Sequence, residues 1–471
     1  MKRGGFDAVI GNPPYIRIQT MKEWAPSEVE IYKDLYTSAS RGNYDIYVVF
    51  VERGLSFLNK SGRLGFILPH KFFNAQYGQP LRGLLSKGKH LAKVVHFGDR
   101  QVFAGATNYT CLLFLDKAGS KQCHFIKVDH LTGWRLNGES TEGKIPAIKI
   151  TSSEWNFTVG KGAELFEKLS KMPVKLGDIA DIFVGLQTSA DDVFIMDLIE
   201  ETSRTFRLKS KALGSEWTFE KGLLFPLVSG TDVNRYCDLP ERQYILFPYK
   251  VDGTSVELID FDVISKNYPK TAAYLLKNKD RLEERERGKF KGYEWYRFGR
   301  SQNLGIQEQI KLCVPRLVTN LYAAFDGEGN HFLDNVDVGG ITLKPGYQKQ
   351  GLIYLLGLLN SKLLRWCFPF VSAPFRGGWI SANRQFLSQL PIRSIDFSDP
   401  TDKSRHDHMM KLVEQILSLH KQLTAAKTPD DKTRLQRQID ATDQQINRLV
   451  YELYGLTENE INIVEAVQFR Q

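Results

Sequence analysis

Cysteine is scarce in this chain of 471 residues. Its five cysteines are far apart, odd in number and never spaced as a Cys-x-x-Cys pair: Cys111, Cys123, Cys237, Cys313 and Cys367. This usage excludes a disulfide framework and offers no zinc site. It predicts reduced, mostly buried thiols in a cytoplasmic protein, and no bound metal.

Long apolar runs are also absent. No stretch approaches the roughly 20 continuous apolar residues of a membrane-spanning helix, and no apolar segment resembling a signal peptide begins the sequence. The chain is 42% hydrophobic, which is enough for large cores in two or three domains. Its net charge of +9 and pI near 9.0 favour a polyanionic partner.

The most informative segment is the apolar run 6–11, which stops at Asn12-Pro13-Pro14-Tyr15. A short apolar run that ends at two prolines predicts a buried strand followed by a rigid turn. In open α/β sheets, ligands bind at the carboxyl edge of the strands. The alternative is a strand and a Pro-Pro turn with no chemical role, which an isolated four-residue match does not exclude.

The groups of this turn suit the exocyclic amine of a flat heterocycle. An adenine amino nitrogen is a poor nucleophile because its lone pair is delocalised into the ring. The Asn12 side-chain oxygen and the Pro13 carbonyl can accept both amine hydrogens, while Tyr15 stacks on the base. Catalysis would then rest on positioning and electrostatic preorganisation. Because a duplex hides this nitrogen, the base must be flipped out.

The following elements extend the pattern. We expect a helix from Asn43 to about Leu58, with Asn43 or Asp45 as its N-cap. Strands are predicted at 65–69, 94–97 and 110–115, the last two bracketing a Gly-rich turn that begins at Phe103. This order resembles the catalytic half of the Taq-type DNA adenine amino-methyltransferases of restriction–modification systems.

The resemblance implies roles for particular residues. In that family the Asn-Pro-Pro-Tyr motif binds the flipped adenine, so Asn12, Pro13, Pro14 and Tyr15 are the implied catalytic residues. Phe103 is the implied second stacking surface. The implied cofactor is S-adenosylmethionine, with Asn12, Pro14 and Phe50 beside it; alternatively, Phe50 is a core residue.

One family feature is lacking. The cofactor loop of this family, with its Gly-x-Gly, precedes the first strand, whereas only residues 1–5 precede the strand here. A partial match at Gly160-Lys161-Gly162 lacks acidic context, and a lone Gly-x-Gly is a weak signal that fits an ordinary loop. The resemblance therefore predicts a separate N-terminal methyltransferase or nuclease half as a partner.

Beyond residue 118 the apolar runs shorten. The segments 176–188, 226–236 and 355–392 resemble, in this order, landmarks of the target-recognition domain in Taq-type enzymes and type I specificity subunits. After residue 400, apolar residues step at 4-3-4 spacings and predict an antiparallel helical hairpin. The implied fold class is an α/β, partial Rossmann-like methyltransferase sheet without its first strands (1–118), an α+β recognition domain (119–400) and a helical tail (401–471).

Cations interleaved with aromatic side chains mark the expected contacts with double-stranded DNA. The run 277–287 is mixed in sign and predicts an exposed helix without a DNA role. Any single arginine is more often a solvated charge, but as a set several should meet phosphates or base edges. The expected contacts are Gln187, Arg235, Lys289, Lys291, Arg297, Arg300, Lys311, Arg316, Arg376 and Arg384.

Two functions of different classes follow. The first is a site-specific DNA adenine-N6 methyltransferase module of a prokaryotic restriction–modification system, incomplete as this chain. The second is a catalytically inactive DNA-binding specificity module, a remnant that keeps recognition without chemistry. Binding of S-adenosylmethionine distinguishes the two.

Overall fold

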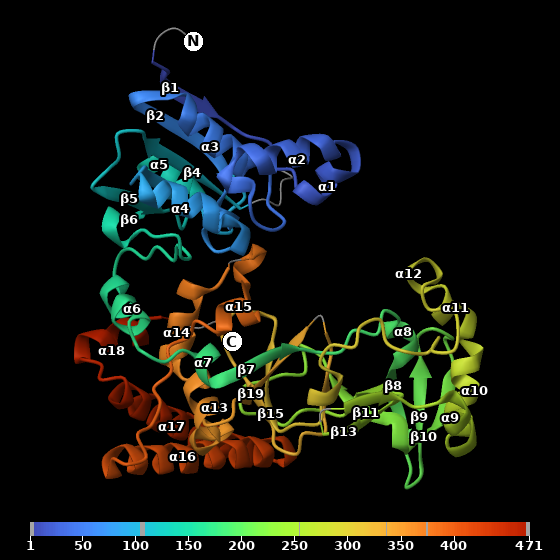
Figure 1. Ribbon diagram of the computed structural model, residues 1–471. Coiled ribbons are helices and arrows are strands. Elements are labelled where there is room, and N and C mark those ends of the chain that lie inside the picture. Colours follow the sequence, from blue (N-terminus) through green and yellow to red (C-terminus); the bar gives the residue numbers. More distant parts are fainter. Residues whose placement is uncertain (1–3, 104–108, 254, 336, 374, 468–471) are drawn as a thin grey trace. The chain divides into compact units, whose positions relative to one another are not determined.

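The computed structural model describes residues 4–103, 109–253, 255–335, 337–373 and 375–467, without the side chain of Arg376. The chain divides into two compact units. Unit 1 comprises Met1–Leu169 and Ala373–Trp379, and unit 2 comprises Ser170–Ser372 and Ile380–Gln471. Figure 1 labels their elements.

Unit 1 is built on a six-stranded sheet with the order β1-β2-β4-β3-β5-β6. Strands β1, β2, β3 and β5 run in the same direction, and β4 and β6 run against their neighbours. The carboxyl ends of β1, β2 and β3 therefore meet at one edge. The strands are β1 (Phe6–Gly11), β2 (Leu58–Pro69), β3 (Leu91–His96), β4 (Thr110–Asp116), β5 (Gln122–Lys127) and β6 (Thr141–Pro146).

The core of unit 1 forms where helices cover this sheet. Helix α3 packs on β1 and β2, and its Val48, Val51 and Leu55 belong to the same buried cluster as Leu64 and Leu68 of β2. The predicted side-chain N-cap of α3 is wrong, because residue 46 occupies that position without a side-chain bond. The helices are α1 (Ile18–Trp24), α2 (Pro26–Leu35), α3 (Tyr47–Phe57), α4 (Gln79–Lys87), α5 (Leu131–Asn137) and α6 (Ala163–Ser170).

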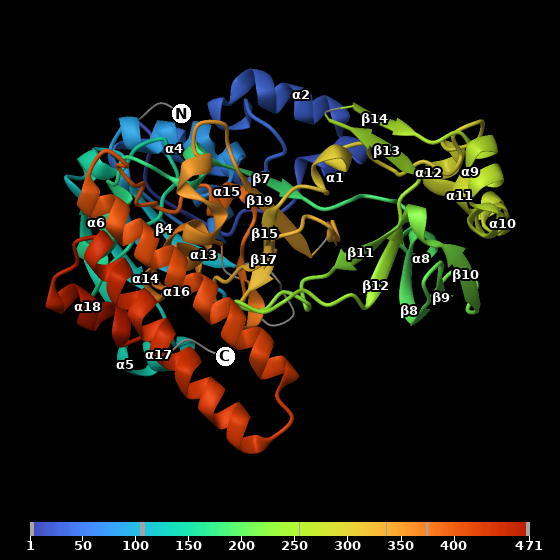
Figure 2. The same ribbon diagram turned by 90° about the horizontal axis from the view of Figure 1, so that it is seen from below.

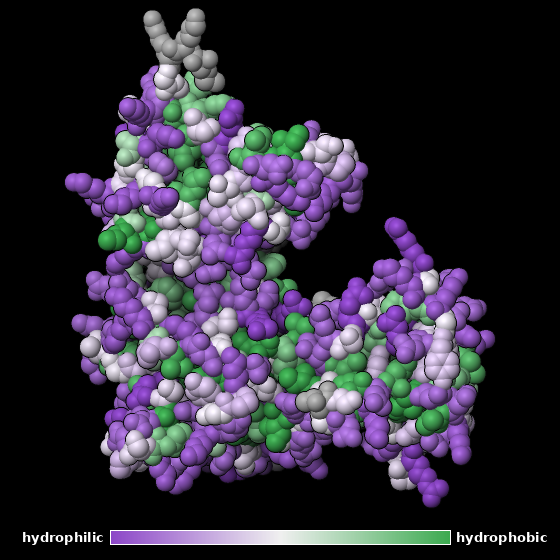
Figure 3. Space-filling view, viewed as in Figure 1, coloured by the Kyte–Doolittle hydropathy of each residue, from purple (hydrophilic) through white to green (hydrophobic). Residues whose placement is uncertain are grey.

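Strand β1 lies where the sequence predicts it, but it is not buried. Its side chains at Phe6 and Ile10 are 51% and 86% exposed. The reason is topological: among the described residues, β1 has β2 as its sole strand neighbour. Figure 3 shows apolar surface in the part of unit 1 around β1. An apolar edge strand with an open side is a ready surface for pairing with another strand.

Unit 2 contains two larger sheets, one of six strands (β10-β9-β8-β12-β11-β18) and one of four (β17-β15-β19-β7). The six-stranded sheet holds β8 (Ile195–Glu201), β9 (Thr205–Ser210), β10 (Glu216–Glu220), β11 (Leu224–Val228), β12 (Gln243–Leu246) and β18 (Phe332–Leu333). The four-stranded sheet holds β7 (Ala180–Val184), β15 (Lys311–Pro315), β17 (Ala324–Asp326) and β19 (Val338–Leu343). Two-stranded ribbons are β13 (Tyr249–Asp252) with β14 (Ser255–Leu258), and β16 (Leu317–Val318) with β20 (Ile380–Ser381).

Some of the shorter helices of unit 2 pack on these sheets, as α13 does on β15 and β17, and others, such as α14 and α18, pack on helices. They are α7 (Leu176–Ile179), α8 (Asp191–Phe194), α9 (Phe261–Asn267), α10 (Pro269–Lys277), α11 (Lys279–Glu283), α12 (Arg285–Gly288), α13 (Leu352–Asn360), α14 (Lys362–Val371), α15 (Arg384–Leu387) and α18 (Glu458–Glu465). In the described part of the chain, no helix has the length and apolar character needed to cross a membrane.

The tail contains two long helices, α16 (Pro400–Ala425) and α17 (Pro429–Leu453), which pack antiparallel along their length (Figure 2). Thr428 caps α17 with Pro429 in its first turn. The seam buries Leu412, Ile416 and Leu419 of α16 against residues of α17: Leu435, Ile439, Thr442, Ile446, Leu449 and Leu453.

The compact units divide the chain differently from the expected boundaries. Strands β5 and β6 lie beyond residue 118, yet they continue the sheet of unit 1. The tail after residue 400 is part of unit 2, because α16 packs on α13 and α17 packs on α14. The sheet pairings and helix contacts, rather than changes in composition, fix these boundaries.

Candidate active site and nucleic-acid interface

The Asn12-Pro13-Pro14-Tyr15 corner leaves β1 at the edge where β2 and β3 also end. Asn12 and Pro14 are exposed, Pro13 is buried and Tyr15 is half-buried. The Asn12 amide is thus open to a ligand, on a backbone that two prolines hold rigid. No contact in the structure tests its predicted catalytic role.

Tyr15 is fixed against the sheet. Its hydroxyl donates a hydrogen bond to the carbonyl oxygen of Ile67 on β2, at 3.1 Å. Its ring meets the ring of Tyr47 edge-on, with centroids 6.5 Å apart. Burial, with a smaller contribution from Cys111, raises the pKa of Tyr15 to about 12, so the phenol is neutral at pH 7. The ring is a rigid apolar surface rather than an acid or a base.

Phe103 lies in the connection between β3 and β4 and is 37% exposed. Both ends of this connection bond to His70, the residue after β2: the His70 N–H donates to the Tyr109 carbonyl at 3.1 Å, and His70 Nε2 meets the Gly98 carbonyl at 3.1 Å. Tyr15 and the connection that carries Phe103 are therefore both tied to the end of β2. A base slot between the two rings stays a prediction, and residues 104–108 of the expected Gly-rich turn lie outside the described residues.

Phe50 projects from α3, the helix that packs on β1. Its side chain is 41% exposed, whereas its neighbours Val49 and Val51 are buried. The alternative that Phe50 is a core residue is therefore wrong. The predicted cofactor contact of Phe50, like those of Asn12 and Pro14, stays a prediction. Gly160 and Gly162 come after β6, away from the end of β1, and both have positive φ, as an ordinary loop allows.

Unit 2 joins three of the expected DNA contacts through Asn335 and Gln187. Gln187 Nε2 donates to the Asn335 side-chain oxygen at 3.0 Å, and the Arg316 guanidinium donates to the Asn335 carbonyl at 3.0 Å. The backbone N–H of Arg300 donates to the Gln187 carbonyl at 3.2 Å. Segments more than 100 residues apart thus form one polar cluster. Whether it meets DNA stays a prediction.

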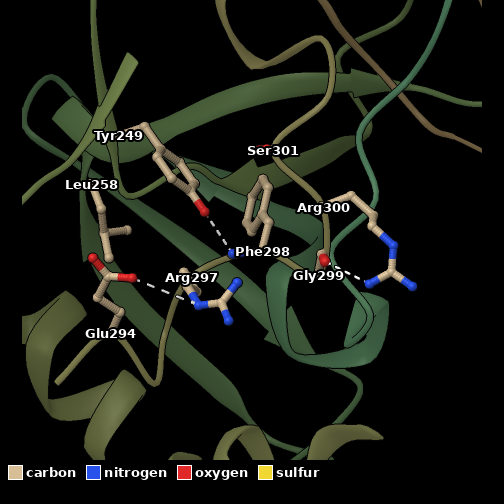
Figure 4. Close-up of a pocket in the computed structure, with 8 residues that line it drawn as sticks. All are labelled: Tyr249, Leu258, Glu294, Arg297, Phe298, Gly299, Arg300 and Ser301. Carbon is tan, nitrogen blue, oxygen red and sulfur yellow. Dashed lines mark hydrogen bonds and ion pairs between the residues drawn. The ribbon is translucent and has the colours of Figure 1, made fainter. Parts of the chain in front are cut away.

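A pocket of about 340 Å³ is lined in part by the segment 289–300, in which cations alternate with aromatic rings (Figure 4). Arg297 stacks on the ring of Phe290 at 4.6 Å and lies 3.7 Å from Glu294. Arg300 bonds Glu286 at 2.8 Å. Lys289 and Lys291 are exposed nearby. The lining residues are Tyr249, Leu258, Glu294, Arg297, Phe298, Gly299, Arg300 and Ser301.

Arg285 holds this segment in place, and its role was missed in the sequence. Its guanidinium donates to four backbone carbonyls, each at 2.8 Å: Leu282, Thr188, Trp295 and Arg297. It also lies 4.0 Å from the centroid of Phe290. The expected exposed helix over 277–287 is confirmed only in part: α11 covers 279–283, but Glu286 and Arg287 adopt positive φ and Arg285 is buried. In the sequence, Gly288, which follows the two positive-φ residues, is the local indication that the helix does not continue.

The DNA contact expected at Lys311 is wrong, because this side chain is buried; Arg235 is half-buried and already bonded within unit 2. Lys311 has no exposed side-chain surface, and its Nζ lies 2.6 Å from Asp326 Oδ2. Arg235 donates to the Asn360 carbonyl and forms an ion pair with Asp443 on α17. Both cations are committed to partners inside unit 2.

The remaining two expected contacts belong to the segment after α14. Arg384 is exposed at the start of α15, in keeping with a surface role. The side chain of Arg376 lies outside the described residues.

Comparison with known proteins bears on these sites. Residues 1–103 match the Eco57I restriction-modification methylase family. Over 98% of its length the chain is 29% identical to the type II restriction enzyme and methyltransferase RM.Eco57I of Escherichia coli, of which it spans 47%. It is 24% identical to the type II methyltransferase M.PaeR7I of Pseudomonas aeruginosa, covering 97% of this chain and 72% of that protein.

Among solved structures, the fold is similar to that of the type IIL restriction-modification enzyme MmeI in complex with DNA. The TM-score is 0.58 at 13% identity, covering 97% of this chain and 56% of MmeI. The chain is thus similar, over nearly its whole length, to type II restriction-modification methyltransferases, and spans about half of RM.Eco57I.

Proposed function

We propose that this chain is the base-binding and target-recognising part of a site-specific DNA adenine-N6 methyltransferase in a restriction–modification system. The observation that carries the proposal is the corner at the end of β1. There an exposed Asn12 amide stands beside a Tyr15 ring that Ile67 and Tyr47 hold in place. The similarity to type II methyltransferases supports it.

The chemistry follows from what the corner offers. The Asn12 side-chain oxygen and the Pro13 carbonyl accept the two hydrogens of the adenine amine, which leaves the nitrogen lone pair less delocalised and more nucleophilic. Tyr15 covers one face of the extruded base, and Phe103 covers the other. Burial keeps the Tyr15 phenol neutral, so its ring works by stacking alone.

The methyl donor binds beside β1 in this proposal. S-adenosylmethionine supplies an electrophilic methyl group when it is bound. Asn12, Pro14 and Phe50 are the residues of this chain that would hold it. These residues would form only one wall of the cofactor site. We infer that a further methyltransferase segment, the N-terminal half, completes the site. It would cover the open edge of β1, where Ile10 and Phe6 of this chain are exposed. RM.Eco57I, about twice as long, has room for such a segment.

The proposed reaction is tested by mapping modified bases. The chain and its N-terminal half are co-expressed in a methylation-deficient bacterium, and the genomic DNA is sequenced with a method that detects modified nucleosides. We expect N6-methyladenine at one recurring sequence. Methylation confined to cytosine, or no modification with both parts folded and associated, would contradict the proposal.

The open side of β1 also favours the second function, a DNA-binding module without chemistry. Calorimetric titration with S-adenosylmethionine separates the two. We expect no measurable binding to the isolated chain, because one wall of the site is insufficient, and micromolar binding once the N-terminal half is added. Tight binding by the isolated chain would exclude the incomplete-site model. No binding by the assembled pair would favour the module without chemistry.

The exposed cations near the unit 2 pocket give a prediction about DNA affinity. Replacing both Lys289 and Lys291 with alanine should weaken binding about equally for all sequences and lower the salt-dependence slope by about 2, one per phosphate contact. The matched control replaces Lys421 and Lys427, two exposed lysines at the α16–α17 turn, with the same change in net charge. Filter binding across a salt series measures both variants. Equal losses in the two variants would mean that net charge, not this surface, binds DNA.

A further inference from the structure

A buried histidine, His70, and a half-buried one, His96, stand beside the proposed base site, and the reaction as proposed does not use them. His70 follows β2, and His96 is the last residue of β3. Their ring centroids are 4.1 Å apart, with planes tilted by 41°. Phe73 lies within 6.2 Å of both rings, and Phe125 lies 5.7 Å from His96. Two imidazoles in such an apolar setting require a reason.

Their hydrogen bonds converge on one residue, Gly98. The Gly98 N–H donates to His96 Nδ1 at 3.1 Å, so Nδ1 carries no proton. The Gly98 carbonyl meets His70 Nε2 at 3.1 Å, so Nε2 must be the donor there. The pair thus holds both polar groups of Gly98; the bond to His96 requires that imidazole to be neutral, whereas His70 donates from Nε2 in either protonation state. Gly98 has a φ of 56°, a left-handed conformation that suits glycine.

Gly98 begins the connection that carries Phe103, five residues further on. We propose that His70 and His96 are positioning residues, which hold Gly98 as the first turn of this connection and thereby set where Phe103 stands over the extruded base. The inference rests on the proposed function for Phe103, although the hydrogen-bonded turn itself does not. Neither histidine touches the reacting atoms in this account.

The bond from the Gly98 N–H requires a neutral His96, and burial disfavours the charged form of both imidazoles. Burial lowers the pKa of His70 to about 4 and lowers the pKa of His96 well below its usual value. The neighbouring imidazole and Lys127, which faces His96 from β5, act on His96 in the same direction. Cys111 pairs with His96 from β4, and its thiol stays neutral because burial raises its pKa. Tyr109 lies near His70, with ring centroids 6.4 Å apart.

The sign of the pH effect follows from linkage. An open, solvated histidine binds a proton near pH 6.5, whereas the closed pair does not until the pH is much lower. As the pH falls below about 6.5, proton binding therefore favours the open turn. The ratio of open to closed turn rises by up to about tenfold per pH unit for each histidine. The Gly98 turn should be stable at pH 7 and progressively lost between about pH 6.5 and 4.

Hydrogen exchange of the purified chain tests this directly. The readout is the protection factor of the amides over residues 97–103 between pH 7 and 5, corrected for intrinsic exchange and compared with β2 as an internal reference. We expect wild-type protection to fall with acidification while β2 is unaffected. His96→Phe removes the acceptor, and should lower protection at pH 7 at least tenfold. His96→Asn offers an oxygen near the Nδ1 position and should restore most of it.

His130→Asn, at an exposed histidine, is the matched control and should change nothing. Protection in His96→Phe within twofold of wild type, or flat wild-type protection from pH 7 to 5, would overturn the proposal. If β2 also loses protection in His96→Phe, that variant is destabilised as a whole, and His96→Asn becomes the test. Failure of His96→Asn to restore protection of the turn would then contradict the proposal.

The complete assembly provides a second readout. His96→Phe should lower kcat for methyl transfer with little change in DNA affinity, and His96→Asn should recover kcat to within a few fold. Equal kcat values for wild type and His96→Phe would overturn the positioning of Phe103. Absence of methylation by the wild-type assembly contradicts the proposed function instead, and hydrogen exchange then decides the role of the histidines alone.

Discussion

Asn12→Ala in the complete assembly should lower kcat about 10²- to 10³-fold, a loss of roughly 2.7–4 kcal/mol of transition-state stabilisation. In the proposed site this change removes one of two preorganised acceptors for the adenine amine, and the exposed Asn12 side chain contributes little to the core of unit 1. DNA affinity should hardly change, because Asn12 meets the base only after extrusion. Single-turnover methyl transfer and a binding titration on the same DNA measure the two effects separately.

The matched control is Asn137→Ala, at an exposed asparagine that ends α5. It should behave as wild type in both assays. A large loss of DNA binding with normal turnover in Asn12→Ala would contradict the role assigned to the amide.

Lys311→Ala should destabilise unit 2 by about 3–5 kcal/mol, because it leaves the carboxylate of Asp326 buried without its charge partner. Lys311 Nζ also donates to the Gln307 carbonyl at 2.6 Å, so a buried acceptor loses its donor as well. Although burial alone would raise it, the pKa of Asp326 lies below its usual value because of a hydrogen bond from His331 and the charge of Lys311. Ionised Asp326 therefore contributes to the free energy of unfolding at pH values above the ordinary pKa of a carboxylate. This contribution is lost as the pH falls through the lowered pKa of the folded state.

Denaturant unfolding monitored by the tryptophans measures the change in free energy. Lys289→Ala, at a lysine whose side chain is 72% exposed, should stay within about 0.5 kcal/mol of wild type. If Lys311→Ala unfolds like wild type but binds DNA poorly, the lysine would belong to the DNA surface after all.

Local patterns predicted much of this structure. The proline-terminated run gave β1 and the corner, and the 4-3-4 spacing gave the seam of α16 and α17, since both depend on neighbours a few residues apart. Whether β1 is buried depends on which strands lie beside it, and an apolar run is compatible with a central strand or an open edge. The exposure of Ile10 therefore had no signal within the run itself.

The DNA surface was the least predictable part. Lys311 and Asp326 meet because β15 pairs with β17, and Arg235 meets Asp443 across 208 positions of the chain. A sequence of charges does not reveal such pairings, so buried cations and exposed ones look alike. Arg285 shows the reverse case: a charge in a mixed run becomes the support of the segment that carries Arg297 and Arg300.

The proposed function requires an adenine held between Tyr15 and Phe103, with its amine on Asn12. The most direct measurement is a crystal structure of the assembled enzyme on its DNA site. We predict the target adenine outside the duplex, stacked on both rings, with its amine within hydrogen-bond distance of the Asn12 oxygen and the Pro13 carbonyl. A target base that stays paired, or that lies in a pocket without Tyr15, would contradict the account.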